Sequence, residues 1–385
     1  MDASGFAKVD GGLGYDLLRL DYSSSTADLR FAFSTDPTRY STFFGQGSSF
    51  KNFEEFVITT GAGNDRITCS GRATTGDGND IIRGAIYAYA GAGDDLIYAS
   101  EETTDVEGGL GIDTLDLSDF TGKASVRLNM SGFNIEVFSV EKVIGTEFDD
   151  YLEGGDYLDG GLGDDELVGD VGNDRHHGSA GNDALSGLKG NDILDGGAGD
   201  DNMYGGAGDD RLLGGDGADH LFSSEGEDVL LGGAGMDYLG GLSGNDRLEG
   251  GSAADTLLGG DGADTIVGGE RQDVLTGGTG SDQFQFFSGD IEPASAQADV
   301  ITDFRHGAGD RINLRGIDAN TSTADVDDRF SFLGTGAFTG TAGELRYAVV
   351  DGNIFVQGDT NGDSLADFYI RVDDVSKLVT ADFVL

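Results

Sequence analysis

The chain has 385 residues, enough for two or three domains, and carries 71 acidic against 23 basic side chains, a formal net charge of −48. This charge excludes nucleic-acid binding, which needs a basic surface, and it opposes binding to anionic membranes. With 68 glycines, 2 prolines and no three-residue period the chain is not collagen-like, and its single cysteine, Cys69, permits no internal disulfide.

The first residues predict neither an export signal nor a membrane anchor. Residues 1–5 contain no basic cluster and lead into no apolar run, so we expect no cleavable signal peptide. No stretch of the chain approaches the roughly 18 apolar residues of a membrane span. We therefore expect no transmembrane segment.

Residues 1–144 hold two copies of a loose glycine-rich unit. Each copy opens with a Gly-Gly-x-Gly-x-Asp turn, continues into alternating strand-like residues, and ends in a second turn, at Asp65 or Asp150. Before that second turn each copy has a glutamate segment, around Glu55 and Glu141. We interpret the region as a duplicated, irregular β-solenoid in which these two glutamates occupy equivalent places and are structural.

Between the two copies, turns recur every fifteen residues, with Asp65, Asp80 and Asp95 at their sixth positions. Fifteen residues suit a coil with a wide turn on one edge and a tight turn on the other, around Gly71 and Gly84. We expect the three aspartates to bind ions along the wide edge.

The chain is organised around residues 160–285, which divide into fourteen consecutive nonapeptides; the unit starting at Gly205 reads Gly-Gly-Ala-Gly-Asp-Asp-Arg-Leu-Leu. Position four is glycine in twelve units, the departures being Ala253 and Arg271, and position eight is apolar in all but one, which has His176. Position six is aspartate in all fourteen: Asp165, Asp174, Asp183, Asp192, Asp201, Asp210, Asp219, Asp228, Asp237, Asp246, Asp255, Asp264, Asp273 and Asp282.

A period this strict indicates one structural unit stacked on itself. The first six residues suit a turn, because glycine adopts positive φ without steric cost, and the last three suit a short strand whose middle side chain points inward. Two nonapeptides would form one coil, with a ladder of Leu and Ile inside and turns along both edges. A disordered linker would not need an apolar position eight. The sequence therefore predicts an all-β fold, a parallel β-roll.

The turns predict a site for a hard cation. Turns eighteen residues apart fall on the same edge, one strand spacing apart, and each offers a carboxylate and several carbonyl groups. Stacked aspartates would repel without a cation, and flexible cages of oxygen atoms suit Ca²⁺ better than Mg²⁺. We expect Asp150 to begin the first edge. Glycines at positions two and four should complete the sites, among them Gly161, Gly163, Gly197, Gly199, Gly206, Gly208, Gly215, Gly217, Gly233, Gly235, Gly260 and Gly262.

This array closely resembles the RTX, or hemolysin-type, family, whose nonapeptide Gly-Gly-x-Gly-x-Asp-x-U-x, with U apolar, binds Ca²⁺. The resemblance implies a right-handed parallel β-roll. After residue 285 the glycine period gives way to alternating strands, and this tail resembles the C-terminal domain of serralysin-type secreted proteases. Those domains carry an uncleaved type I secretion signal, which implies type I secretion machinery as a partner. Alternatively, residues 383–385 form a final core strand, and both can hold.

We therefore expect three regions. Residues 1–144 should form the irregular solenoid with degenerate RTX turns, residues 145–285 the regular array, and residues 286–385 a β-sandwich-like C-terminal domain that caps the roll.

The sequence gives no strong sign of a catalytic site. The histidines, His176, His177, His220 and His306, lack the His-Glu-x-x-His spacing of zinc proteases, and no Gly-x-Ser-x-Gly elbow or Walker lysine is present. Adjacent His176 and His177 would lie on opposite strand faces and could not share an ion, and one would be a tolerated core residue. Residues 359–370 start like an EF-hand loop but lack its Gly and Glu, which leaves a turn or a weak ion site open.

We predict a secreted, extracellular, non-enzymatic protein that folds on binding Ca²⁺ after type I export. A rival interpretation is a polysaccharide-binding or adhesive module, since similar repeats follow the catalytic domain in alginate-modifying epimerases; candidate contacts would be Tyr22, Tyr87, Tyr89 and Tyr98. The sequence is also compatible with a detached C-terminal part of a larger secreted enzyme, and with an enzyme that has its own site in residues 1–144.

Seven turns on each edge leave six gaps per edge, which predicts about twelve Ca²⁺ ions in the main array and a few more in residues 1–150. The array carries 26 acidic and 5 basic side chains, a net charge of −21, so twelve ions would nearly neutralise it. The Asp255–Asp273 gap should be weakest. There Ala253 and Arg271 put a Cβ where positive φ is expected, at a cost of about 1 kcal/mol or more, and Arg271 adds a cation.

Overall fold

The computed structural model describes residues 8–10, 17–32, 41–43, 49–51, 55–128, 135–290, 293–322 and 328–385. These residues form an all-β protein, and their helical content is confined to two 3-10 segments, Ser295–Gln297 (η1) and Thr380–Asp382 (η2). The chain divides into two compact units, Met1–Asp170 and Val171–Leu385. Within the described residues, no helix has the length and apolar character of a membrane span.

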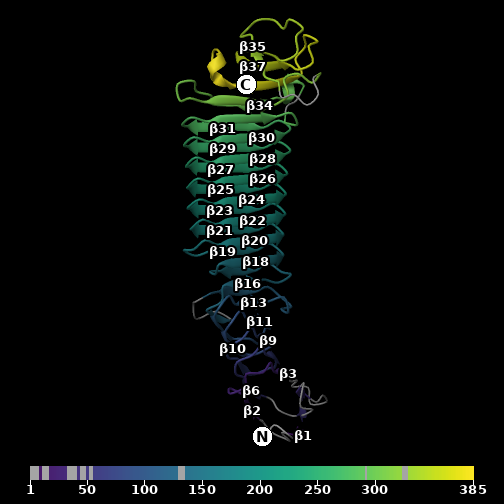
Figure 1. Ribbon diagram of the computed structural model, residues 1–385, viewed down its shortest axis with the longest axis vertical. Coiled ribbons are helices and arrows are strands. Elements are labelled where there is room, and N and C mark those ends of the chain that lie inside the picture. Colours follow the sequence, from purple (N-terminus) through teal and green to yellow (C-terminus); the bar gives the residue numbers. More distant parts are fainter. Residues whose placement is uncertain are drawn as a thin grey trace. The chain divides into compact units, whose positions relative to one another are not determined.

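The unit Val171–Leu385 is a parallel β-roll in which successive strands alternate between two sheets (Figure 1). One sheet contains β20 (Arg175–Ala180), β22 (Ile193–Ala198), β24 (Arg211–Asp216), β26 (Val229–Ala234), β28 (Arg247–Ser252), β30 (Thr265–Glu270), β32 (Gln283–Phe287), β34 (Arg311–Gly316) and β39 (Phe383–Val384). The other contains β21 (Ala184–Lys189), β23 (Asn202–Ala207), β25 (His220–Glu225), β27 (Tyr238–Ser243), β29 (Thr256–Asp261), β31 (Val274–Thr279), β33 (Asp299–Ile301), β38 (Phe368–Val372), β37 (Asn353–Asp359), β36 (Glu344–Val350) and β35 (Ser331–Phe332).

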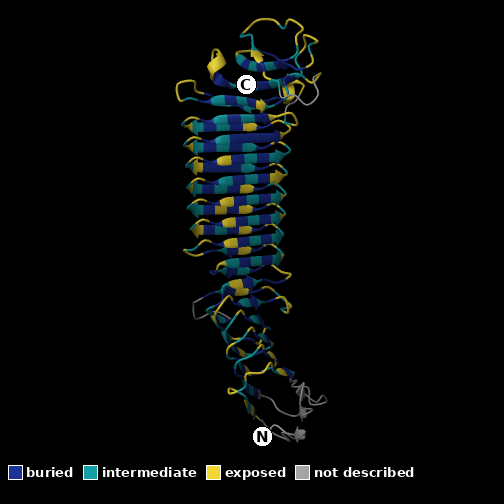
Figure 2. Ribbon diagram, viewed as in Figure 1, coloured by how far each residue is buried: buried dark blue, intermediate teal, exposed yellow. Residues whose placement is uncertain are grey.

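The register of the roll follows the nonapeptide. Strands of one sheet pair in parallel with partners eighteen residues away, as Leu212 does with Leu230 and Leu221 with Leu239. Position eight points inward and is fully buried along the array, while positions seven and nine are more exposed in most coils, so that buried and more exposed residues alternate along most strands (Figure 2). Burying a Leu or Ile side chain contributes roughly 1.5–3 kcal/mol, so this ladder supplies the hydrophobic core.

The tail continues both sheets of the roll. β33 pairs in parallel with β31, and β34 pairs with β32. From there β38 pairs in parallel with β33, and β37 and β36 extend the same sheet in antiparallel fashion, while the C-terminal β39 joins β34. Phe383 is buried and lies 4.9 Å, between ring centroids, from Phe332. The closing residues therefore do form a core strand.

The unit Met1–Asp170 is a less regular solenoid. Its strands in one sheet are β1 (Lys8–Asp10), β3 (Arg30–Ala32), β4 (Ser41–Phe43), β5 (Ser49–Lys51), β7 (Arg66–Thr68), β9 (Ile81–Arg83), β11 (Leu96–Tyr98), β13 (Thr114–Asp116), β16 (Lys142–Ile144) and β18 (Tyr157–Leu162). Opposite strands are β2 (Leu17–Asp21), β6 (Glu55–Thr59), β8 (Arg72–Thr74), β10 (Tyr87–Ala92), β12 (Asp105–Leu110) and β15 (Glu136–Phe138), and then β14 (Ser125–Arg127), β17 (Tyr151–Glu153) and β19 (Glu166–Val168).

The fifteen-residue coils occur where the spacing predicts them. Arg66 pairs with Ile81, and Ile81 with Leu96, in parallel strands on one face. On the other face Arg72 pairs with Tyr87, also fifteen residues along the chain. Each of these coils thus has one wide turn and one tight turn.

The two copies of the glycine-rich unit have matching strand pairings, but the predicted equivalence of Glu55 and Glu141 is wrong. β2 pairs with β6 and β3 with β7 in the first copy, as β13 pairs with β16 and β14 with β17 in the second. Leu17 pairs with Glu55, whereas its counterpart Thr114 pairs with Lys142, so Glu55 corresponds to Lys142 and not to Glu141. The opening turn of the first copy and Glu54, the counterpart of Glu141, lie outside the described residues.

Candidate metal centre

The position-six aspartates form a buried ladder along each edge of the roll. Every one of them is almost inaccessible to solvent. The backbone N–H of each aspartate donates to Oδ1 of the aspartate one coil further on, as Asp201 does to Asp219 and Asp219 to Asp237, at 2.8 and 2.9 Å. Within Val171–Leu385 this bond closes eleven gaps of the array. The ladder therefore uses one carboxylate oxygen per turn.

The second carboxylate oxygen is buried without a hydrogen-bond donor. This holds for Oδ2 of Asp201, Asp210, Asp219, Asp237, Asp246, Asp255, Asp264, Asp273 and Asp282. A buried, unpaired carboxylate oxygen costs several kcal/mol of free energy unless a counter-charge satisfies it. The arrangement is thus incomplete without a cation.

The position-one glycine leaves an open cradle beside that oxygen. A Cβ on Gly214 would lie 2.4 Å from Asp219 Oδ2 and 2.5 Å from the carbonyl oxygen of Gly232, one coil further on. The same convergence recurs at Gly196, where the distances to Asp201 Oδ2 and the Gly214 carbonyl are 2.2 and 2.8 Å. Two oxygens from consecutive coils meet there because no side chain intervenes. This role of position one was not predicted from the sequence.

Positions two and four hold positive φ, as expected. Gly215 and Gly217 have φ of 114° and 143°, and the other predicted glycines, Gly161, Gly163, Gly197, Gly199, Gly206, Gly208, Gly233, Gly235, Gly260 and Gly262, lie between 105° and 143°. A Cβ on Gly217 would approach the Gly199 carbonyl oxygen to 2.0 Å, so the close stacking of turns also requires glycine. These turns bring backbone carbonyl groups of adjacent coils together.

The metal-free carboxylates are strongly perturbed. Burial raises the pKa of Asp201 and Asp210 to about 7, and the charges of the neighbouring ladder aspartates add to the shift. The pKa of Asp255 rises furthest, to about 8, through burial and then through the charges of Asp273 and Asp237. A bound cation would reverse both causes, because it compensates the buried charge and screens the repulsion.

A second ladder runs through position five in the opposite direction. The N–H of Asp200 donates to the Asn182 side-chain oxygen, and Ala218 N–H donates to Asp200 Oδ1, each at 2.8 Å. Asp209 and Asn191 make the matching bond on the other edge, at 3.0 Å. These Asx contacts tie a turn to the coil before it where that coil has Asp or Asn at position five. They were not predicted from the sequence because position five varies between Asp, Asn and other residues.

The donor set fits a hard, flexible cation. Among the described residues, no three His, Cys, Asp or Glu side chains gather as a metal site. Each turn instead presents one aspartate oxygen among backbone carbonyls, which is the all-oxygen chemistry that Ca²⁺ takes with 6–8 ligands. Asp219 and Gly232, with their equivalents in each coil, would hold the ion.

Comparison with known families agrees with this geometry. Residues 87–115, 144–175, 177–212 and 204–239 match the family model described as the RTX calcium-binding nonapeptide repeat, in four copies. Residues 228–385 match the model described as the peptidase M10 serralysin C-terminal region. The chain therefore contains RTX calcium-binding nonapeptide repeats and a serralysin C-terminal region. Ca²⁺ is therefore the ion of these turns.

Comparison with individual proteins adds little. No curated protein matches the chain. A solution structure of the AlgE6R3 subunit from the Azotobacter vinelandii mannuronan C5-epimerase is similar at 24% identity, over 49% of this chain and 78% of that one, with a TM-score of 0.23.

The RTX ladder also runs through the unit Met1–Asp170. N–H groups of Asp65, Asp80 and Asp95 donate to the next aspartate at 2.7 to 2.9 Å, the last acceptor being Asp113. Asp113 in turn donates to Glu141 Oε2 at 2.8 Å, so this glutamate occupies a ladder position. Oδ2 of all four aspartates has no donor. Asp113 and Glu141 were not predicted to belong to the edge, because eighteen- and twenty-eight-residue steps interrupt the fifteen-residue period.

Asp150 differs from the other predicted ligands. Its Oδ1 accepts from Ala124 N–H at 2.6 Å, and its Oδ2 accepts from Thr146 N–H at 2.6 Å. Both oxygens are therefore engaged by the protein. Asp150 still donates its own N–H to Asp165 Oδ1 at 2.7 Å, so it begins the edge as a cap.

The RTX ladder extends beyond residue 285 and ends in a cap made of protein groups. Asp273 and Asp282 donate their N–H groups to Asp299 and Asp310, at 2.9 and 3.2 Å. Asp310 Oδ2 accepts from Arg305 N–H at 2.7 Å, and the Arg305 guanidinium contacts the Gly278 carbonyl. In this last turn an arginine meets a position-two carbonyl.

The remaining sequence candidates do not form sites. Both carboxylate oxygens of Asp359 accept backbone N–H groups, from Gly362 and Ser364 at 2.6 and 2.9 Å, and Asp367 accepts from Thr360, so the EF-hand-like segment is a turn. His176 is fully buried in the core. His177 faces outward, with its Nε2 3.8 Å from Asp195 Oδ2.

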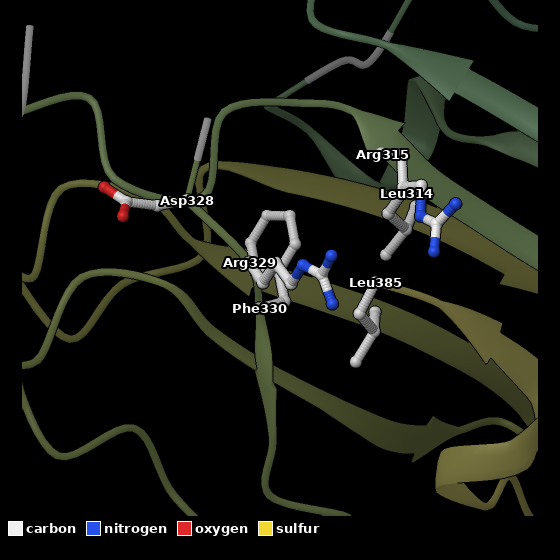
Figure 3. Close-up of a pocket in the computed structure, with 6 residues that line it drawn as sticks. All are labelled: Leu314, Arg315, Asp328, Arg329, Phe330 and Leu385. Carbon is white, nitrogen blue, oxygen red and sulfur yellow. The ribbon is translucent and has the colours of Figure 1, made fainter. Parts of the chain in front are cut away.

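Among the residues that the structure describes, no catalytic constellation lines the pocket near the C-terminus. It is lined by Leu314, Arg315, Asp328, Arg329, Phe330 and Leu385 (Figure 3). Two guanidinium groups face it, and the Asp328 carboxylate points away from them (Figure 3). The pocket thus pairs no nucleophile with a base.

The metal-free roll should lose stability as pH rises. The folded-state pKa values of Asp201, Asp246 and Asp255, about 7, 6 and 8, exceed the ordinary value of 3.8. Between these values the folded state binds more protons than the unfolded state, so its stability is greatest below about pH 4 and declines through about pH 8. Circular dichroism in metal-free buffer should therefore show more β-structure at about pH 5 than at about pH 8. Equal β-structure at the two pH values would contradict the raised pKa values.

The Asp255–Asp273 gap is expected to fill last with Ca²⁺. Ala253 and Arg271 keep the positive φ of position four, 89° and 86°, which strains residues with a Cβ. Arg271→Gly should tighten the last step of a Ca²⁺ titration on the order of tenfold, and Ala253→Gly, which changes no charge, should reproduce the part due to strain.

Position two supplies the control for this titration. Ser179, Leu188, Ser224 and Leu242 also carry positive φ there, from 70° to 112°. Ser179→Gly should leave the last titration step unchanged, because it lies several coils away from the Asp255–Asp273 gap. An unchanged last step in both position-four variants would show that this gap is not the weakest.

Proposed function

We propose that this RTX protein is a secreted, extracellular, non-enzymatic protein that folds by binding Ca²⁺ after type I export. The observation that carries the proposal is the row of buried aspartates whose second oxygen lacks a donor, repeated coil after coil on both edges. Such a row is stable only with a cation in each gap. Folding and metal binding are therefore one process.

The same carboxylates would keep the chain unfolded inside the cell. Where free Ca²⁺ is low, aspartates stacked at one strand spacing of about 4.8 Å would repel one another. An extended, highly acidic chain suits passage through a narrow export channel. Outside, roughly millimolar Ca²⁺ matches the affinity of extracellular calcium modules. Closure of the roll would then prevent the chain from sliding back.

We further propose about twelve Ca²⁺ ions in residues 160–285. Six gaps on each edge give that number, and eleven of these gaps lie within Val171–Leu385. Twelve divalent ions would bring the array's net charge of −21 close to zero. Ladder aspartates in residues 1–150 would add a few more, with Asp150 as the weakest candidate because its oxygens already accept backbone N–H groups.

Export would depend on the C-terminal residues. The match to the serralysin C-terminal region reaches residue 385, and the short strand β39 pairs with β34 and packs through Phe383 against Phe332. A short closing strand of this kind can be read by the type I secretion machinery while the chain is unfolded and can join the core once the roll has formed.

The proposed non-enzymatic role rests on what the predicted acidic residues do. Glu141 accepts a backbone hydrogen bond in the ladder, and Glu55 begins a paired strand. For Glu141 this contact is structural and is not a proton-transfer arrangement.

Removing Ca²⁺ should unfold the roll. Circular dichroism of the full chain in chelator should show mostly disorder, and millimolar Ca²⁺ should restore β-structure cooperatively, whereas Mg²⁺ should not, because it demands tighter octahedral geometry. Asp219→Asn should raise the Ca²⁺ concentration needed. Asp216→Asn, the same charge change at an exposed position three, should not. Complete β-structure in chelator at low salt would refute the proposal. If both variants need the same higher Ca²⁺ concentration to fold, the effect comes from net charge and not from the ladder position.

Deleting residues 380–385 should block secretion. The measurement is the share of the chain in the medium when it is expressed with type I secretion machinery. Calcium-induced folding of the purified truncated chain should persist, because its ladder of residues 160–285 is intact. Secretion of the truncated chain at the full-length level would contradict a C-terminal signal.

A further inference from the structure

On one face of the roll, the outward side chains in the middle of the strands carry no charge. The outward positions seven and nine of β21, β23, β25, β27, β29 and β31 form this uncharged face, which none of Asp, Glu, Lys or Arg enters. Its residues are Ala184, Ser186, Asn202, Tyr204, His220, Phe222, Tyr238, Gly240, Thr256, Leu258, Val274 and Thr276. Parallel pairing places the position-seven residues in one row and the position-nine residues in another. Within each row, neighbouring residues lie one strand spacing apart.

The opposite sheet is charged at the same positions. It has Arg175, Asp195, Arg211, Arg247 and Glu249, and the last two form an ion pair at 2.9 Å. On a chain with a net charge of −48, six consecutive strands whose outward positions seven and nine are all uncharged are not needed for solubility. The core does not need them either, because these side chains face outward.

Four aromatic rings lie together in the middle of the uncharged face. Tyr204 and Phe222 stack with centroids 5.7 Å apart and planes at 13°, Phe222 meets Tyr238 at 5.5 Å, and Tyr238 meets His220 at 6.1 Å. A Cβ on Gly240 would lie only 3.0 Å from the Phe222 ring, so this glycine lets the ring lie across the next coil. Tyr204 is 54% exposed.

The side chains of the uncharged face favour a ligand that has flat apolar surfaces and hydroxyl groups. Exposed ring faces bind flat apolar surfaces, and Tyr, Asn, His, Ser and Thr beside them offer uncharged donors and acceptors for hydroxyl groups. The strongly acidic chain repels polyanions, anionic membranes and a second copy of itself. A basic protein would need acidic side chains on the face, and it has none.

We propose that this face binds a neutral polysaccharide, whose sugar rings stack on Tyr204, Phe222 and Tyr238. Binding positions that repeat at each strand suit a polymer with a repeating unit. The tyrosines named from the sequence lie elsewhere: the Arg72 guanidinium covers Tyr87 and Tyr89 at 5.1 and 5.0 Å, and that of Arg83 covers Tyr98 at 4.0 Å. This inference goes beyond the proposed function and requires only that the roll is folded.

Native affinity electrophoresis of the full chain in Ca²⁺ tests the proposal, with hydroxyethylcellulose, soluble starch, galactomannan or alginate in the gel. At least one neutral polymer should retard the protein, and alginate should not. The double variant Tyr204→Ser/Phe222→Ser should weaken retardation on the order of tenfold or more, as loss of central aromatic contacts does at interfaces. The matched control Leu213→Ser/Leu231→Ser changes position nine of the charged sheet and should be retarded like the unmodified chain.

Circular dichroism in Ca²⁺ confirms that the variants are folded, and so separates this test from that of calcium-driven folding. The proposal is overturned if none of the three neutral polymers retards the chain, if alginate does so more strongly, or if the folded aromatic variant binds as before. It is also overturned if the unmodified chain is a dimer that the aromatic variant converts to a monomer, because the face then serves self-association.

Discussion

The structure depends on stacking like charges at strand spacing. Each coil must place its aspartate above the previous one, because the N–H of one donates to Oδ1 of the next, as in Asp201, Asp219 and Asp237. That bond buries the carboxylate and leaves Oδ2 facing the position-one cradle. The hydrophobic ladder at position eight fixes the spacing at which the charges meet. The core and the metal site are therefore two consequences of one nine-residue repeat.

Much of this was predictable because one constraint repeats fourteen times. Position six, position eight and the positive φ at positions two and four are visible as residue types at fixed spacing. The role of the position-one glycines could not be predicted from the pattern, because glycine is an ordinary turn residue. It becomes clear only from the close approach of Asp219 Oδ2 to Gly214. Asp113 and Glu141 were missed for a related reason. They take up ladder positions after steps of different length, which a period cannot predict.

The ends of the ladder show how the fold stops. An interior aspartate leaves Oδ2 for an ion, whereas Asp150 and Asp310 have both oxygens engaged by backbone N–H groups. At the C-terminal end Arg305 contributes both a backbone donor and a guanidinium group against Gly278. Fixed protein donors thus take the place of the cation at Asp150 and Asp310. An acidic array needs such caps for the same reason that a helix does, because its terminal groups have no partners in the repeat.

Ser223 shows that the hydrogen-bond ladder of a turn does not depend on an open position-one cradle. It is the one position-one residue of the fourteen that is not glycine, and it is fully buried. Its hydroxyl donates to the Gly241 carbonyl at 2.8 Å, the carbonyl that elsewhere borders the open cradle. Even so, Asp228 N–H still donates to Asp246 Oδ1 at 2.9 Å. The backbone ladder therefore persists where a protein hydroxyl enters the cradle. Coil stacking sets the geometry of the edge, and the cation is needed to compensate the charge that this geometry buries.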